Sequence, residues 1–460
     1  MQRTVETLPL WKKIIYALGQ LGWSLASFSV GNLLVYFYLP PEESNNAIFQ
    51  PYIYQGYVIG VLTIIGLIYA FGRLWDAITD PIIATMSDRS KSRFGRRRKF
   101  LAIGGLPFAL LSILAFTPPV NGMSPWNAVW LFVVVTLFYL FMTMYVTPFF
   151  AWLSELGHNP RERLFLSTLI SITWAIGFAI GSQAVALQSM FEKSYGYSSH
   201  RAFQTVMVIF GGISLILMYL PVLFIDERRY CESNVSTEGT FEALRSAFKN
   251  KNFLFFTISD LAYWVALTFI TTGLVYYVTV LLQMDKAVYS QYMIILFALS
   301  FIFYVPVNVI AQKIGKKKLM IIAFILFSMG YVIASMLGWF PFDKNIQGLI
   351  VIIITSLPLA IFGILPNAII ADIAEADGIE KGNFKAGIFF GARTFMSKMG
   401  QMIAALVFPS LILLGKTPEN DIGVRLTCIA ACFFCIAGLL LFMKYDEKKI
   451  ISILAKKEKV

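Results

Sequence analysis

Twelve long apolar stretches divide the sequence and constrain its fold more than any other feature. A helix needs roughly 20 apolar residues to cross a hydrocarbon core of about 30 Å. The stretches lie near residues 13–38, 57–87, 100–119, 125–155, 163–188, 204–224, 253–282, 291–311, 318–340, 347–372, 387–414 and 425–443. We therefore expect an all-α membrane protein with twelve transmembrane helices.

The composition agrees with a chain embedded in lipid. Hydrophobic residues make up 58% and charged residues 14% of the 460 positions, and the mean hydropathy is +0.70, unlike soluble globular proteins. Four cysteines and two histidines provide neither a zinc site nor the base of a hydrolase. We expect no enzyme and no resident cofactor.

The net charge of +12 could indicate nucleic-acid binding, so its distribution along the chain decides its meaning. Most Lys and Arg residues lie in the two tails and in the even-numbered connections between stretches. This asymmetry is the positive-inside pattern, and it predicts a multi-pass protein of the cell membrane with both termini in the cytoplasm. Attraction of basic tails to anionic lipid accounts for the excess charge without nucleic acid.

A polar segment at 226–252 separates six apolar stretches from six. We expect it to link an N-terminal bundle (1–225) to a C-terminal bundle (253–460). Within it, Phe241, Leu244 and Phe248 recur at helical spacing beside basic residues, a pattern typical of a short amphipathic helix on a membrane surface.

The two halves resemble each other at matching positions. Gly95 and Gly315 stand in basic turns after the second and eighth stretches, and Pro148 and Pro366 lie within the fourth and tenth. An acidic residue follows each proline at the cytoplasmic end: Glu155 and Asp372. Six spans repeated in parallel indicate the two-bundle plan of major-facilitator carriers, whose substrate binds near the membrane midplane.

Three charged residues fall within the second stretch. Arg73, Asp76 and Asp80 are spaced by three and four residues, which puts them on one helix face. Because a charge at the centre of a span costs about 2.5–3.5 kcal/mol, such residues are functional candidates. With Arg73 offsetting one carboxylate, the remaining charge suits one monovalent cation; the alternative is an Arg73–Asp76 ion pair that only fixes helix packing.

Two threonines could complete this cation site. Thr79 lies beside the aspartates and Thr143 lies in the fourth stretch, and hydroxyl and carboxylate oxygens are the ligands that a hard cation prefers. Two nearby carboxylates can also share a proton. The residues therefore leave Na⁺, Li⁺ and H⁺ open as coupling ions.

The later stretches contain further charged residues. Lys398 lies deep in the eleventh stretch, where it could face a central cavity and touch cation or solute, or be satisfied by backbone carbonyls. Asp260, in the seventh stretch, could contact solute or reach the interface. Arg393 is expected to serve a cytoplasmic gate.

The solute site is expected among polar and aromatic side chains. The first stretch presents a helical stripe that fits either a water-filled cavity or helix packing: Gln20, Ser24, Ser27 and Gly31, flanked by Trp23. Four aromatic residues could stack on a solute ring or could be core residues: Tyr145, Trp174, Tyr263 and Trp264.

Three motifs together resemble the glycoside-pentoside-hexuronide:cation symporter family over essentially the whole chain. The first is Gly72-Arg-Leu-Trp-Asp76-Ala-Ile-Thr-Asp80-Pro, followed by Asp88-Arg-Ser-Lys-Ser-Arg-Phe-Gly95-Arg. The second runs from Ala371-Asp372 to Lys381-Gly-Asn-Phe-Lys-Ala-Gly387, and the third is Lys398-Met-Gly400.

The resemblance implies the fold, the activity and part of the site. The cation site falls on Asp76, Thr79, Asp80 and Thr143, and Lys398 matches a lysine that links cation and sugar sites. The sugar site departs from the family pattern, with Ser24, Val146, Phe150 and Ser171 where its sugar carriers hold charged or tryptophan side chains. A sugar or glycoside is the expected solute, and a lysolipid or other amphiphile is the alternative.

These features predict a monomeric alternating-access symporter, whose partners are the bilayer, a small-molecule solute and a monovalent cation. The turns after Gly95 and Gly315 are expected to form cytoplasmic gates with acidic partners. The expected gating residues are Arg73, Asp88, Arg96, Glu155, Asp372 and Arg393.

Overall fold

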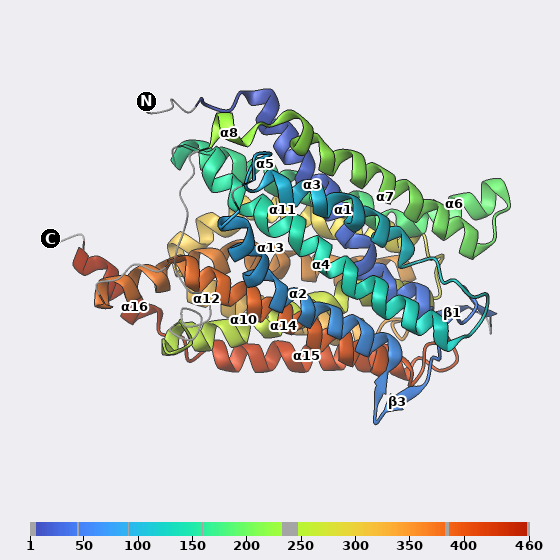
Figure 1. Ribbon diagram of the computed structural model, residues 1–460. Coiled ribbons are helices and arrows are strands. Elements are labelled where there is room, and N and C mark those ends of the chain that lie inside the picture. The colour runs from blue at the N-terminus through green and yellow to red at the C-terminus, as the bar shows by residue number, and fades with distance from the viewer. Residues whose placement is uncertain are drawn as a thin grey trace. The chain divides into compact units, whose positions relative to one another are not determined.

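A computed structural model describes residues 6–43, 46–90, 92–158, 160–231, 247–381 and 386–457. Figure 1 shows long helices as the dominant elements. Contacts divide the chain into two compact units, one of Met1–Pro40 with Ala47–Thr237 and the other of Pro41–Asn46 with Glu238–Val460. Each unit is built around six long helices.

The described residues of the first unit form eight helices and a small hairpin. The helices are α1 (Leu10–Tyr38), α2 (Ile64–Asp88), α3 (Arg98–Leu114), α4 (Pro125–Leu156), α5 (Pro160–Ser182), α6 (Ala184–Tyr195), α7 (Ser199–Phe224) and the short α8 (Glu227–Tyr230). Strands β3 (Tyr57–Ile59) and β4 (Leu62–Thr63) pair antiparallel before α2.

In the described part of the second unit there are seven α-helices and one π-helical turn. They are α10 (Lys251–Tyr276), the π-helix η1 (Tyr277–Leu281), α11 (Val288–Ile314), α12 (Lys316–Ser335), α13 (Lys344–Lys381), α14 (Ala386–Ile412), α15 (Ile422–Phe442) and α16 (Glu447–Lys457). The two-residue strands β1 (Glu42–Glu43) and β2 (Asn46–Ala47) pair with each other.

The same neighbour pattern occurs in both units. In the first, α1 packs on α5 and α7, α3 packs on α4 and α7, and α2 packs on α4. In the second, α10 packs on α14 and α15, α12 packs on α13 and α15, and α11 packs on α13. The predicted repeat of six spans is therefore confirmed in the packing.

Ten helices within the described ranges are long and apolar enough to cross a membrane. The predicted second and third spans are also helical, as α2 and α3, but α2 carries Arg73, Asp76 and Asp80 and α3 has only 17 residues. Together these make the expected twelve. Large apolar side chains on these helices are exposed within the described residues, such as Val305 at 72% and Phe433 at 67%, as expected of helices in contact with lipid.

One predicted boundary was wrong, and one predicted helix lies largely outside the described residues. Residues 57–63, expected to begin the second span, form the exposed β3–β4 hairpin, because Gly60 adopts a left-handed φ of 60° that makes a turn. Helix α2 begins after Thr63, whose side chain accepts a hydrogen bond from the Gly66 amide. The predicted amphipathic helix in the 226–252 segment falls largely on residues 232–246, outside the described residues.

Close helix approach in the first unit depends on glycine. A Cβ atom at Gly22 of α1 would lie 2.8 Å from the Ser214 carbonyl oxygen of α7. By contrast, a Cβ atom at Gly212 of α7 would meet no atom within 4 Å. Gly22 therefore sets the distance between α1 and α7, and Gly212 does not.

Candidate functional site

The two expected aspartates of α2 face threonines of α4. Thr143 Oγ1 donates a hydrogen bond of 2.6 Å to Asp76 Oδ1, and these side chains are only 1% and 0% exposed. One helical turn further, Thr147 Oγ1 donates to Asp80 Oδ1 at 2.9 Å. Two aspartates spaced by four residues thus match two threonines spaced by four, because both helices turn at the same pitch.

Thr79 joins this group of oxygen atoms. Its hydroxyl oxygen lies 3.3 Å from Thr143 Oγ1 and 2.9 Å from the carbonyl oxygen of Trp75, and Thr79 is 4% exposed. The structure therefore brings the four residues expected from sequence into adjacent positions on α2 and α4. We call Asp76, Thr79, Asp80, Thr143 and Thr147 the oxygen cluster.

Thr147 was not among the sequence candidates. Its spacing of four from Thr143, equal to the Asp76–Asp80 spacing, was the available signal. That signal has meaning only once α2 and α4 are known to pack in this register, which the sequence alone does not provide.

Arg73 lies one turn from Asp76 among aromatic rings. Its guanidinium is 5.5 Å from the ring centre of Tyr69 and 5.0 Å from that of Tyr139, and Nη2 donates to Tyr69 Oη at 3.3 Å. Cation–π contact with these tyrosines holds the guanidinium, and both the cation site and the packing alternative for Arg73 and Asp76 stay predictions.

The polar stripe of α1 divides into packing and unpaired groups. Ser24 is fully buried and donates to the carbonyl of Leu21, and Ser27 donates to Met142 Sδ at 3.3 Å. By contrast, buried atoms Gln20 Oε1 and Trp23 Nε1 have no hydrogen-bond partner among the described residues. Gln20 and Trp23 therefore suit a ligand-facing role better than the two serines do.

The aromatic candidates of the first unit have different surroundings. Tyr145 is 0% exposed, donates to the Met218 carbonyl at 2.8 Å and is enclosed by neighbouring rings, so its position does not favour the expected solute stacking. Phe150 is 45% exposed beside Trp23, and Trp174 packs on Phe178 at 4.3 Å between ring centres. These two remain able to offer a ring face.

In the second unit the structure joins two candidates that the sequence treated separately. Asp260 of α10 and Arg393 of α14 form a two-pronged ion pair, with Nε to Oδ2 at 2.9 Å and Nη2 to Oδ1 at 3.2 Å. Arg393 Nη1 also donates to Asn367 Oδ1 of α13 at 2.6 Å. The carboxylate of Asp260 is therefore buried and paired with Arg393, and does not extend to the membrane interface as an isolated charge.

The remaining candidates of the second unit lie nearby in sequence. Tyr263 is 3% exposed and stacks on Phe362 at 4.1 Å, and Trp264 meets Tyr263 edge to face. Lys398 is half-buried on α14. Because Lys398 and Asp76 belong to different units, the link between them stays a prediction.

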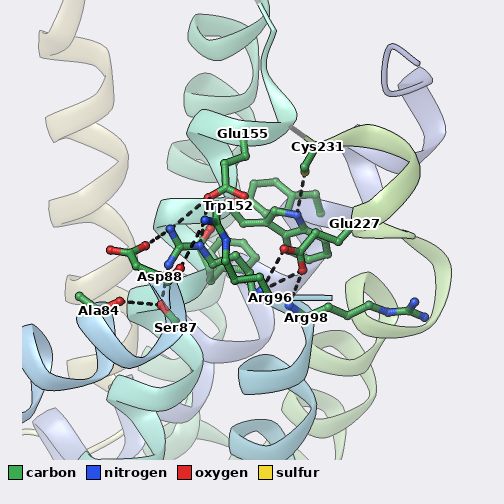
Figure 2. Close-up of polar contacts among 12 residues, drawn as sticks. Ala84, Ser87, Asp88, Arg96, Arg98, Trp152, Glu155, Glu227 and Cys231 are labelled. Carbon is green, nitrogen blue, oxygen red and sulfur yellow. Dashed lines mark hydrogen bonds and ion pairs between the residues drawn. The ribbon is translucent and has the colours of Figure 1, made fainter. Parts of the chain in front are cut away.

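The turn between α2 and α3 is fixed by a cluster of charged side chains (Figure 2). Glu155 Oε1 of α4 accepts from Arg96 Nη2 at 2.7 Å and forms an ion pair with Arg97 at 3.0 Å. Arg97 also pairs with Asp88 and donates to Ser87 Oγ. Three expected gating residues, Asp88, Arg96 and Glu155, are thus neighbours. Arg97, which belongs to the same predicted gate turn, pairs with both acidic residues.

Glu227 of α8 caps the start of α3. Its carboxylate accepts the backbone N–H groups of Arg97 at 2.9 and 3.0 Å and of Arg98 at 2.8 Å, where a negative charge complements the helix dipole. Burial raises the pKa of the Glu227 carboxyl, although these amide hydrogen bonds oppose the shift. Gly95, with a φ of 116°, leaves room for this carboxylate.

The second unit repeats the arrangement. Glu447 of α16 accepts from the Lys317 amide at 3.1 Å at the start of α12, beside Gly315, while Lys316 Nζ pairs with Asp372 at 2.5 Å. Neither glutamate was a candidate. The signal was the repeat itself, since Asp226-Glu-Arg-Arg and Asp446-Glu-Lys-Lys are separated by the same interval as Gly95 and Gly315.

Nearly the whole chain matches a known protein family. Residues 15–447 match the family described as MFS/sugar transport protein. The chain belongs to this family. It is therefore a multi-pass membrane transporter and not an enzyme, and its resemblance to cation symporters is confirmed at the family level.

Individual relatives are distant but cover much of the chain. The uncharacterized symporter YnaJ of Bacillus subtilis is 24% identical over 98% of this chain and 95% of its own length. The isoprimeverose transporter of Lactiplantibacillus pentosus is 23% identical over 71% of this chain and 64% of its own. Among solved structures, the nucleoside transporter NupG superposes with a TM-score of 0.65 at 14% identity, covering 95% of this chain and all of that one, which shows the shared fold.

Proposed function

We propose that this protein is a secondary active transporter that couples uptake of a sugar or glycoside to a monovalent cation by alternating access. The observation that carries the proposal is the oxygen cluster, in which carboxylates of α2 are hydrogen-bonded to hydroxyls of α4 inside the membrane-spanning part of the first unit. Names of relatives support the solute class, since one is an isoprimeverose transporter.

The chemistry of the cluster favours a hard cation. All its side-chain ligand atoms are oxygen, and no group of three or more His, Cys, Asp or Glu side chains able to hold a metal ion occurs in the described part of the chain. Carboxylate and hydroxyl oxygens replace the hydration shell of Na⁺ or Li⁺, and the same carboxylates can accept H⁺. The coupling ion is therefore Na⁺, Li⁺ or H⁺.

Cation binding would drive the cycle by stabilising one conformation. A ligand shifts a conformational equilibrium only by its difference in affinity for the two states. Neutralising Asp76 and Asp80 would lower the cost of burying them and so favour a state that accepts solute. The charged clusters at Gly95 and Gly315 lie within their own units, and we propose that they hold the helix ends that move as gates.

The proposal includes a place in the cell membrane with both chain ends in the cytoplasm, supported by the positive-inside distribution of Lys and Arg. It also includes a monomeric carrier in contact with the lipid bilayer.

Uptake into membrane vesicles tests the site assignment. Wild type should take up isoprimeverose or a related glycoside faster with an inward Na⁺, Li⁺ or H⁺ gradient than without one, and Asp76→Asn should lose that stimulation. Glu419→Gln is the matched control, because Glu419 is an exposed acidic side chain. Cation stimulation that persists unchanged in Asp76→Asn would rule out this site, and uptake of a lysolipid in place of sugars would replace the solute class.

A further inference from the structure

A second charged cluster lies within spans, separate from the oxygen cluster. Asp260, Arg393 and Asn367 come from α10, α14 and α13 of the second unit. Asp260 is 1% exposed, whereas Asn367 is exposed. The Asp260 carboxylate is thus buried in the helix bundle, whereas the Asn367 amide is accessible.

Packing alone gives little reason for charges at this position. Removing two charges from water carries a desolvation penalty, and well-packed apolar residues of similar volume are often as stable as a buried ion pair. Inside membrane proteins, such charges usually face a cavity and mark the pathway of the transported substance. We therefore expect the Asp260–Arg393 pair to contact a ligand.

The cluster retains unused donors and acceptors. A guanidinium has five N–H groups and a carboxylate about four lone-pair sites. In the described part of the chain, Arg393 uses one N–H group each on Nε, Nη2 and Nη1, and Asp260 accepts two of these hydrogen bonds. N–H donors and lone-pair acceptors remain side by side, and a hydroxyl group both donates and accepts, so neighbouring hydroxyls of a sugar fit this set.

An aromatic ring lies one turn from the carboxylate. Trp264 follows Asp260 by four residues on α10 and so shares its face, and its buried Nε1 has no partner among the described residues. Gly400 of α14 allows this side to pack closely, since a Cβ atom there would lie 3.0 Å from Trp264 Cβ. An indole with an apolar ring and a spare N–H suits a ligand that is apolar on one face and polar at its edge.

We propose that Asp260, Arg393 and Asn367 bind adjacent hydroxyl groups of a transported sugar or glycoside, with Trp264 beside its ring. This rests on the proposed function, which supplies the solute class. Arg393 is then a solute-binding residue, and its expected role as a gate is replaced.

The test measures sugar affinity of the purified full-length protein by isothermal titration in saturating cation, using isoprimeverose, other disaccharides and their monodeoxy analogues. Asp260→Asn and Arg393→Gln should each weaken binding at least tenfold. Removing the bound hydroxyl from the sugar should weaken binding to wild type but change little in Asp260→Asn, because the two changes remove the same interaction. Cation binding, followed by thermal shift, should persist in both variants.

Two further variants separate binding from folding. The charge swap Asp260→Arg with Arg393→Asp restores an ion pair, so it should recover thermal stability without recovering sugar affinity. Asp421→Asn breaks another ion pair of the second unit, Asp421–Arg425, and should leave sugar affinity unchanged.

The outcomes distinguish a solute-binding role of the Asp260–Arg393 pair from a purely structural one. Recovery of sugar affinity by the swap, or equal penalties for the deoxy sugar in wild type and Asp260→Asn, would show that the pair is only structural. Failure of wild type to bind any sugar at any cation concentration would overturn the proposed function and this inference together.

Discussion

Replacing Thr143 by valine tests the role of the oxygen cluster most sharply. Valine keeps the shape of threonine but lacks the hydroxyl that donates to Asp76 Oδ1 at 2.6 Å. Both side chains are buried, so water cannot readily substitute. A hydrogen bond to a charged group contributes about 1.5–3 kcal/mol, and about 1.4 kcal/mol corresponds to a factor of ten in affinity.

We therefore expect Thr143→Val to weaken Na⁺ or Li⁺ affinity by roughly 10- to 100-fold, because it removes a hydroxyl oxygen that would coordinate the ion. If H⁺ is the coupling ion, the same change should strengthen its binding, because the hydroxyl stabilises the charged carboxylate. The assay is the cation concentration that gives half-maximal thermal stabilisation of the purified protein, measured for Na⁺ and Li⁺ and, through pH, for H⁺. Thr136→Val is the matched control, because Thr136 lies on the same helix, is half-buried and donates to the Phe132 carbonyl of its own helix. An affinity of Thr143→Val equal to that of the control would refute the assignment of the cluster as the cation site.

Four other substitutions have definite expected outcomes. Thr147→Val should weaken cation affinity several-fold, less than Thr143→Val does, because its partner Asp80 is only half-buried; the same titration checks this. Burial raises the pKa of the Glu227 carboxyl above its usual 4.5, so the stability that this carboxyl contributes is complete below pH 4.5 and is lost as pH rises through the raised pKa. Glu227→Gln should therefore show a smaller fall in melting temperature than wild type between pH 4.5 and 8. An equal fall in the two proteins would contradict this. Gly22→Ala should destabilise the protein by about 1–3 kcal/mol through overpacking, whereas Gly212→Ala should stabilise it by roughly 0.5–1 kcal/mol; denaturation in detergent that ranks them in the opposite order would contradict the packing account.

The fold was largely predictable, because apolar segments of bilayer length form helices in lipid whatever their detailed sequence. The β3–β4 hairpin was not, since Tyr57, Val58, Ile59 and Val61 are apolar and extend the second stretch without a break. Short apolar runs do not distinguish strand from helix. Only the turn at Gly60 marks the change.

Parts of the site could be predicted and others could not. Asp76 and Asp80 stood out because charges within a span are costly. Glu227 did not, because it meets the start of α3 about 130 residues earlier in the chain, and its surroundings in sequence resemble any polar loop. The pairing of Asp260 with Arg393 likewise requires the packing of α10 on α14, which no local pattern encodes.

Accumulation of a glycoside by the purified protein in sealed proteoliposomes tests the central proposal most directly. With an inward gradient of the coupling cation, the internal concentration of isoprimeverose, or of another glycoside that the protein binds, should rise above the external concentration. It should fall back when an ionophore collapses that gradient. Internal solute that only reaches the external concentration, whatever cation gradient is imposed, would contradict the proposal that this protein is a cation-coupled symporter.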